Sequence, residues 1–194
     1  RYVEFLPLAE RLSQFWPGPL TLVLPRRADA GLSDLVAAGL ATVGIRIPDH
    51  PLALALIAAA KLPLAAPSAN PSGRLSPTSA SQVRAALPDV PVLDGGPCRA
   101  GLESTILALD GDAVTQLRAG ALPRAEIEAA LGRPIAVARQ GSTVAAPGML
   151  ASHYAPNAAL RLDATAAAPD ETLLGFGSIA GDLNLSPSGD LHEA

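Results

Sequence analysis

The stretch TILALDGDAVTQL, residues 105–117, predicts an antiparallel hairpin and decides the class of sheet. Two apolar runs flank Asp110-Gly111-Asp112, and an Asp-Gly pair suits a tight turn between antiparallel strands. Elsewhere along the chain, strand-like apolar runs alternate with helical patterns. Because a hairpin occurs among alternating strands and helices, we expect an α/β or α+β fold with a mixed sheet.

The remaining elements follow from hydrophobic periodicity and from helix-start and turn signals. We expect helices over residues 5–15, 32–40, 51–61, 77–87 and 123–131, and strands over residues 20–24, 42–48, 62–66, 90–93, 135–138, 159–162 and 172–176. Residues 140–156 are rich in Gly, Ser and Pro, as a linker would be. The predicted division is a domain over residues 1–139, a linker over 140–157, and the start of a second domain over 158–194.

The composition is that of a globular chain, with 49% hydrophobic residues and a net charge of −4. The near balance of charges argues against a general nucleic-acid-binding surface, which needs a clustered basic patch. The single cysteine, Cys98, excludes disulfide frameworks within the chain and fits a reducing compartment. The longest apolar helix candidate, residues 52–60, is too short to span a bilayer, so we expect a cytoplasmic protein.

The stretch TVGIRIP, residues 42–48, predicts a strand with one apolar face and one face formed by Thr42, Gly44 and Arg46. A glycine inside a strand often marks close approach by a ligand or another backbone. The planar fork of Arg46 suits a carboxylate or a phosphate. An exposed sheet face with a surface salt bridge explains the same pattern equally well.

The stretch PSANPSGRLSP, residues 67–77, predicts a stiff polar loop between a strand and a helix. Ser68 and Asn70 supply donors and acceptors, and Ser76 is the expected N-cap of a helix that begins at Pro77. The start of that helix would favour an anion. The alternative is an ordinary turn followed by a capped helix.

Two further candidates lie beyond the loop. Glu103-Ser104-Thr105 lies where a glycine-rich loop enters a strand, and Ser104 and Arg118 fall at the same open end of the predicted hairpin, so both could contact one ligand. The alternative is an ordinary hairpin with surface ends. His153 and Tyr154 lie within the predicted linker, where they would form a lid over a ligand or an anchor for the linker. The sequence shows no metal-ligand cluster, nucleophile–base pair or paired carboxylates, so we expect catalysis by positioning and electrostatics.

Taken together, the motifs FWPGPLTLVL, TVGIRIPDHP, APSANPSGRLSPT, ESTILAL and LRAGALP resemble the YrdC-like family of L-threonylcarbamoyladenylate synthases. The stretch GSTVAAPGMLASHYAP resembles the linker of the two-domain type, which leads to a small Rossmann-like domain. The resemblance implies an open twisted mixed sheet with surrounding helices, of the YrdC/RibB type. It also implies formation of threonylcarbamoyl-AMP and pyrophosphate from L-threonine, bicarbonate and ATP with Mg²⁺, for threonylcarbamoyladenosine modification of tRNA through partner proteins.

Carried over residue by residue, the resemblance implies two sets of binding residues, with no catalytic side chain and no protein ligand to a metal. The ATP set is Thr42, Ser68, Asn70, Ser76, Arg118, His153 and Tyr154. The threonine set is Arg46, Ala66 and Ser104, with the Arg46 guanidinium holding the amino-acid carboxylate. Direct contact with tRNA is left open.

The sequence also departs from the family pattern. The family's N-terminal portion, with its Lys-x-Arg pair for phosphates, has no counterpart here. We therefore expect a fragment that is inactive or nearly so by itself. The competing interpretations are an RNA-binding module of the same fold without synthase activity and a carbamoyl-transfer domain of the hydrogenase-maturation type.

Overall fold

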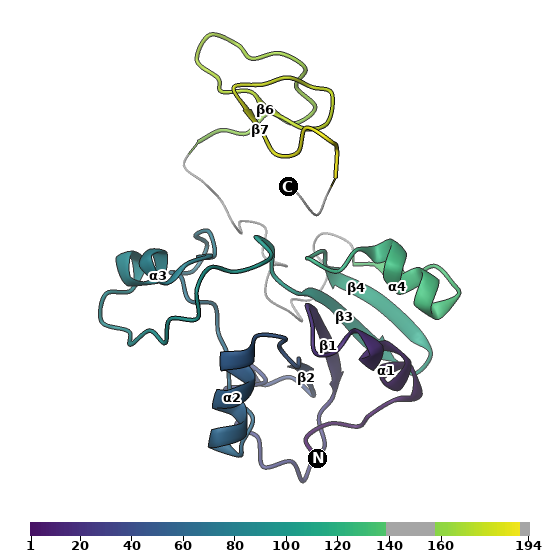
Figure 1. Cartoon of the computed structure of the whole chain (residues 1–194). Helices are drawn as coiled ribbons and strands as arrows, with labels where there is room; N and C mark the ends of the chain where they lie inside the picture. The colour runs from purple at the N-terminus through teal and green to yellow at the C-terminus, as the bar shows by residue number, and fades with distance from the viewer. Residues whose placement is uncertain (139–157, 191–194) are drawn as a thin grey trace. The chain divides into compact units, whose positions relative to one another are not determined.

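The computed structural model describes residues 1–138 and 158–190. The chain divides into two compact units, Arg1–Ala155 and Pro156–Ala194. The first contains a five-stranded sheet with its helices, and the second contains a two-stranded sheet (Figure 1). Within residues 1–138 and 158–190, no helix combines the length and the apolar character that crossing a membrane requires.

The five-stranded sheet consists of β1 (Leu20–Pro25), β2 (Thr42–Ile45), β3 (Thr105–Asp110), β4 (Ala113–Arg118) and β5 (Ala136–Val137). Its strand order is β2-β1-β3-β4-β5. The pairs β1–β3 and β4–β5 are parallel, whereas β1–β2 and β3–β4 are antiparallel. The predicted class, an open mixed sheet with surrounding helices, is confirmed.

The hairpin predicted from residues 105–117 is formed by β3 and β4. Asp110 pairs with Ala113 across the turn. Gly111 has a φ of 53°, in the left-handed region that a Cβ atom makes costly. The two-residue turn is therefore Gly111-Asp112, and the glycine supplies the positive φ that closes the hairpin.

One face of the sheet carries the main hydrophobic core. The core includes Leu8, Leu12, Leu20, Leu22, Leu24, Leu107, Leu109, Ile127 and Leu131. The helices α1 (Pro7–Leu12) and α4 (Arg124–Leu131) supply the residues outside the sheet, and the Arg11 side chain donates to the Ala130 carbonyl at 3.0 Å (Figure 1). Successive strand residues point to opposite faces, so the other face carries Thr21 and a smaller cluster around Val23 and Ile106.

Three predicted strands are wrong. Residues 62–66 and 90–93 have no strand structure, and residues 62–66 are exposed. Each stretch contains a proline, Pro63 or Pro91, which has no N–H to donate to a sheet ladder. Residues 159–162 are also not a strand, and β2 ends at Ile45, earlier than the predicted end at residue 48.

Two predicted helices also differ. Residues 32–40 contain successive turns over 34–39 and no helix, because Ala38 and Gly39 have φ values of 50° and 74° that no α-helix contains. The helix predicted to begin at Pro77 is α3 (Ala80–Ala86), with Ser79 as its N-cap. The Ser79 hydroxyl accepts from the Gln82 N–H, and the Gln82 side chain accepts from the Thr78 N–H at 2.7 Å. By contrast, α2 (Pro51–Ala60) begins where predicted, capped by the His50 ring.

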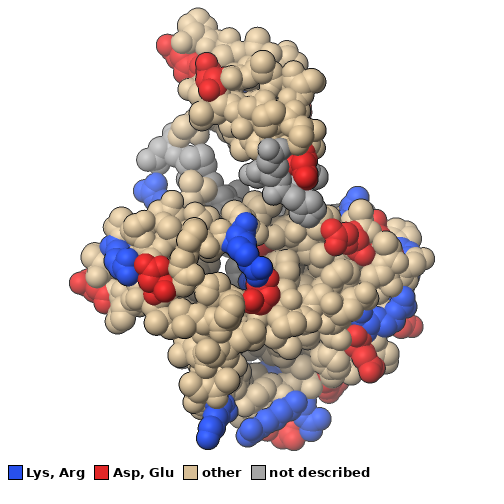
Figure 2. Space-filling view, viewed as in Figure 1, with Lys and Arg blue, Asp and Glu red and all other residues tan. Residues whose placement is uncertain are grey.

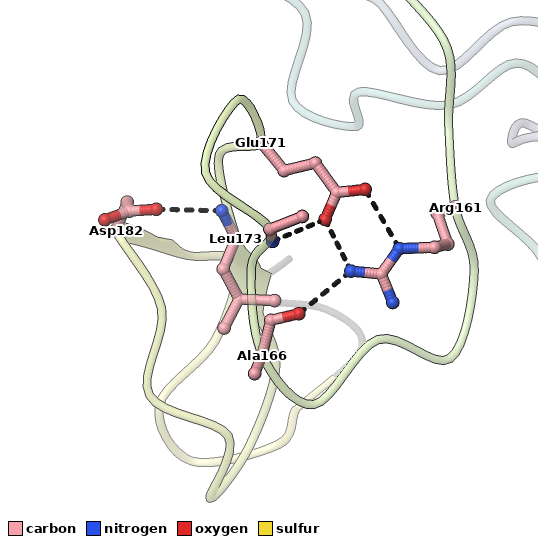
Figure 3. A network of polar contacts seen from close by, with 6 residues as sticks. Arg161, Ala166, Glu171, Leu173 and Asp182 are labelled. Carbon is pink, nitrogen blue, oxygen red and sulfur yellow. Dashed lines mark hydrogen bonds and ion pairs between the residues drawn. The ribbon is translucent and has the colours of Figure 1, made fainter.

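The second unit contains β6 (Leu174–Gly175) parallel to β7 (Leu183–Asn184) and a polar network beside them (Figure 3). Arg161 forms a two-pronged ion pair with Glu171, with Nε donating to Oε1 at 3.0 Å and Nη2 bonding Oε2. The same carboxylate accepts from the Ala168 N–H at 2.9 Å. The network therefore ties residues 161–171 together through one carboxylate.

This network predicts an unusual titration of Glu171. The hydrogen bonds from Arg161 and then from the Ala168 backbone lower the pKa of Glu171 from 4.5 to about 2. Because the folded-state pKa is depressed, the stabilisation is present above about pH 4.5 and is lost as the pH falls towards 2. Titration of the Glu171 side-chain carboxyl by NMR is expected to give a midpoint near the lower value. Arg161→Gln should return it towards the ordinary range, and an ordinary midpoint in the unchanged chain would contradict the network.

Candidate functional site

The candidate site lies at one edge of the five-stranded sheet. Strands β1 and β3 are parallel to each other, β2 is antiparallel to β1, and β4 is antiparallel to β3. The register therefore places the amino ends of β1 and β3 beside the carboxyl ends of β2 and β4. Thr21 and Ser104 come from the first pair of strand ends. Arg46 and Arg118 come from the second. Residues that are far apart in sequence therefore lie at the same edge. Two of them contribute hydroxyl groups and the other two contribute guanidinium groups.

Ser104 is buried and forms hydrogen bonds with both Arg118 and Thr21. The Arg118 side chain donates to the Ser104 carbonyl through Nε at 3.1 Å and Nη2 at 2.9 Å, and to the Ser104 hydroxyl at 3.2 Å. The Thr21 hydroxyl lies 2.7 Å from the Ser104 hydroxyl. The expectation that Ser104 and Arg118 meet at the open end of the hairpin is confirmed. The contacts fix both side chains before any ligand arrives.

The chain approaches the site strand closely at Gly120. The Ala121 N–H donates to the Glu103 carbonyl at 2.8 Å, which brings residues 119–121 against the start of β3. A Cβ atom at Gly120 would lie 2.4–2.5 Å from backbone atoms of Glu103, Ser104 and Thr105. Only glycine permits this approach. Thr105 itself points into the core, where its hydroxyl donates to the Leu122 carbonyl at 2.7 Å.

Arg46 lies just beyond β2 and is solvent-exposed as a whole. Its Nε donates to the Gly18 carbonyl at 2.9 Å, which leaves the Nη groups to bind a ligand. Partial burial of the guanidinium lowers the pKa of Arg46, nearby Asp49 opposes this shift, and Arg118 adds to it. Two cations therefore influence each other at this edge, which favours an anionic ligand.

The loop over residues 66–76 supplies the other candidates. Ala66 and Ser68 are exposed, and no strand precedes them. Asn70 donates to the Pro71 and Arg74 carbonyls at 3.0 and 2.9 Å. The Ser76 hydroxyl donates to the Glu103 carboxylate at 2.6 Å. The loop is thus joined to the sheet edge through the residue next to Ser104.

A hollow of about 350 Å³ opens beside this loop. Its lining includes Asn70, Pro71, Leu75, Ser76 and Pro77, and continues to Gln82 and Ala86 on α3. The volume falls within the usual range for small-molecule sites, about 300–1,000 Å³. Mostly apolar walls with a few polar groups can hold a flat organic ligand and fix its orientation.

One predicted residue, Thr42, is not brought to this edge. Thr42 and Arg46 share a face of the predicted strand but lie four residues apart, about 13 Å along it. Thr42 pairs with Pro25, at the opposite end of β1 from Thr21. His153 and Tyr154 lie outside the described residues.

Sequence reasoning missed Thr21 and the contact between Ser76 and Glu103. Thr21 stands between Leu20 and Leu22, so strand alternation was a signal that it faces away from the core. The Ser76–Glu103 contact joins residues 27 positions apart, so no local pattern predicts it.

Comparisons with known proteins identify the family of the chain. Residues 2–120 match a family model described as "Telomere recombination" (Sua5, YciO and YrdC), and residues 122–186 match one described as "Threonylcarbamoyl-AMP synthase, C-terminal domain". Threonylcarbamoyl-AMP synthase of Bacillus subtilis (strain 168) is 49% identical over 157 residues, which cover 78% of this chain and 45% of the relative. The enzyme of the same name from Pyrococcus abyssi is 44% identical over 157 residues, with coverage of 77% and 46%.

Solved structures show the same fold. The crystal structure of P. abyssi Sua5 complexed with L-threonine has a TM-score of 0.75 and 42% identity, covering 81% of this chain and 48% of that one. Escherichia coli YciO, with a TM-score of 0.55 and 22% identity, is similar in fold alone. The chain spans about half the length of the curated relatives it matches.

Proposed function

The chain belongs to the Sua5, YciO and YrdC family, and we propose that it carries an L-threonine- and ATP-binding portion of an L-threonylcarbamoyladenylate synthase. The reaction joins L-threonine, bicarbonate and ATP into threonylcarbamoyl-AMP, with release of pyrophosphate and water. The product would serve threonylcarbamoyladenosine modification of tRNA through partner proteins. This makes the protein a nucleotidyltransferase, for which we propose a cytoplasmic location.

The proposal rests on the hydrogen bonding and partial burial of the Arg46 guanidinium. Its one hydrogen bond within the described residues goes to the Gly18 carbonyl, and neighbouring Asp49 is paired with Arg99 instead. A partly desolvated guanidinium with free Nη groups suits a two-pronged bond to a carboxylate. We assign the threonine carboxylate to Arg46, with Ser104 and the backbone around Ala66 as further contacts.

We propose that ATP lies along the 66–76 loop. Ser68, Asn70 and Ser76 would contact it from the loop, and Arg118 and Thr42 from the sheet, with His153 and Tyr154 closing over it. The residues described in this chain include no group of three or more His, Cys, Asp or Glu side chains that could form a metal cage. Mg²⁺ would therefore enter with the phosphates of ATP, as part of the substrate.

The reaction requires the protein mainly to position its substrates. Bicarbonate and the threonine amino group form a carbamate, whose oxygen attacks the α-phosphorus of ATP while pyrophosphate leaves. Arg46 would hold the amino acid by its carboxylate so that its nitrogen faces the nucleotide. The second cation of the edge, Arg118, would stabilise negative charge while holding Ser104 in place.

The chain alone is proposed to be inactive or nearly so, because its relatives contain about as many residues again outside the aligned portion. Threonine- and bicarbonate-dependent pyrophosphate release at the rate of an intact relative would contradict this. The division into residues 1–139, 140–157 and 158–194 stays a prediction about domains.

The proposed function is tested by calorimetric titration of the 194-residue chain. L-Threonine and Mg·ATP are each expected to bind, and D-threonine should bind at least tenfold more weakly than L-threonine. Binding of neither ligand would overturn the proposal. Steep salt-dependent binding of tRNA without nucleotide binding would favour the RNA-binding alternative, although the face seen in Figure 2 shows basic and acidic side chains interspersed rather than a basic stripe.

A further inference from the structure

Asp49 lies three residues after Arg46, the arginine to which the proposed function assigns a carboxylate. Burial lowers the pKa of Arg46, and the negative charge of Asp49 opposes this shift, so the two side chains influence each other electrostatically. A carboxylate is also the preferred partner of a guanidinium fork. An ion pair between Asp49 and Arg46 would therefore compete with any anionic ligand for the Nη groups of Arg46.

The structure shows Asp49 bonded to a different arginine. Arg99 Nη2 donates to Asp49 Oδ2, and neither side chain forms another hydrogen bond or ion pair within residues 1–138 and 158–190. The two side chains are 74% and 43% exposed. Ion pairs with this exposure contribute little to stability. The main consequence of the pair is therefore the position in which it holds the Asp49 carboxylate.

The loop that carries Arg99 is fixed at two points. The His50 Nε2 lies 3.1 Å from the Gly95 carbonyl oxygen, and the Cys98 N–H donates to the Thr78 carbonyl at 2.8 Å. A Cβ atom at Gly95 would lie 2.6 Å from the His50 ring, so the contact with the ring depends on glycine. Arg99 follows the second of these points directly. Its position beside the segment after β2 is therefore set by the backbone as well as by the ion pair.

We propose that Arg99 is a positioning residue that withholds Asp49 from Arg46 and so keeps the Arg46 guanidinium available to the carboxylate of L-threonine. Without Arg99, the Asp49 carboxylate would turn to Arg46 and occupy its Nη groups. The inference rests on the proposed function, because it concerns the residue assigned to threonine. It requires no contact between Arg99 and the ligand.

Arg99→Ala is expected to weaken L-threonine binding about threefold, which is the scale of an exposed ion pair that competes with the ligand. Arg99→Lys should retain most of the affinity, because an ammonium group still provides a cation for Asp49. Arg27→Ala breaks a comparable exposed pair, with Asp29, and is the matched control that should leave binding unchanged. Calorimetric titration measures the affinities, and the urea midpoint of Arg99→Ala should match that of the unchanged chain.

The deciding measurement is a double-mutant cycle with Asp49→Asn. If Arg99 acts through Asp49, Arg99→Ala should weaken threonine binding in the unchanged chain and have no effect in the Asp49→Asn background. A direct or long-range effect of the Arg99 charge would weaken binding equally in both backgrounds and would overturn the proposal. Full threonine affinity in Arg99→Ala would overturn it as well.

A second readout needs no ligand, namely the NMR signal of the Arg46 Nε–H group. The signal should shift when Arg99→Ala is introduced into the unchanged chain, and it should not shift when the same change is made in Asp49→Asn. If L-threonine binds but Arg99→Ala leaves the Arg46 signal in place, the inference alone is overturned. If the signal shifts as expected but L-threonine does not bind the unchanged chain, the assignment of threonine to this site fails while the exchange of partners stands.

Discussion

Replacing Arg46 with alanine is expected to weaken L-threonine binding about 100-fold, equivalent to ~3 kcal/mol. The reason is the geometry of its guanidinium, which is held by one bond to the Gly18 carbonyl while its Nη groups can form a two-pronged bond to the threonine carboxylate. Arg46→Lys should recover only part of the affinity, because an ammonium group keeps the charge but lacks the planar fork. Calorimetric titration with L-threonine measures both effects.

Two controls separate this role from a loss of folding. Arg27→Ala removes an exposed arginine that pairs with Asp29, so it should leave threonine binding unchanged. ATP binding should be largely retained in Arg46→Ala, because Arg46 is assigned to the amino acid. Threonine binding that survives Arg46→Ala at full strength would end the assignment.

Replacing Gly120 with alanine is expected to disrupt the site by displacing the backbone of residues 103–105. The new Cβ would lie 2.4 Å from the Glu103 carbonyl oxygen and 2.5 Å from backbone atoms of Ser104 and Thr105. These are backbone atoms of the site strand and cannot rotate away, so β3 must shift. We expect unfolding free energy to fall by about 1–3 kcal/mol, with loss of most threonine affinity.

Gly101→Ala is the matched control for this substitution. Gly101 lies in the loop before β3, has no atom within 4 Å of an added Cβ, and does not have a positive φ. Urea denaturation of both variants should show a lower midpoint for Gly120→Ala and little change for Gly101→Ala. Equal stability of the Gly120 variant and the unchanged chain would mean that the close approach at residues 103–105 is not as described.

The sheet was predictable where local sequence alone determines structure. The β3–β4 hairpin follows from two apolar runs around Asp110-Gly111, and β1 follows from a compact apolar run. Prediction failed at residues 62–66 and 90–93, because apolar composition was weighed above the prolines within them. It also failed at α3, where Ser76 was the expected N-cap and Ser79 caps the helix instead, its hydroxyl accepting from the Gln82 N–H.

The site was predictable only where hairpin register brings residues together. Ser104 and Arg118 lie at paired strand ends, so their meeting could be read from the sequence. Thr21 reaches Ser104 across 83 positions and Glu103 reaches Ser76 across 27, through parallel pairing and loop packing that no local pattern encodes. Non-local contacts of this kind therefore account for what sequence reasoning missed, namely Thr21 and the contact between Ser76 and Glu103.

The most direct test of the central claim is an NMR titration that follows the guanidinium Nε–H signal of Arg46 while L-threonine is added, with L-threoninamide as the comparison ligand. The two ligands differ at the carboxylate, the group assigned to Arg46. We predict a saturable shift of the Arg46 signal with L-threonine and a much weaker response to the amide. An Arg46 signal that does not move with L-threonine, or that moves equally with both ligands, would contradict the assignment.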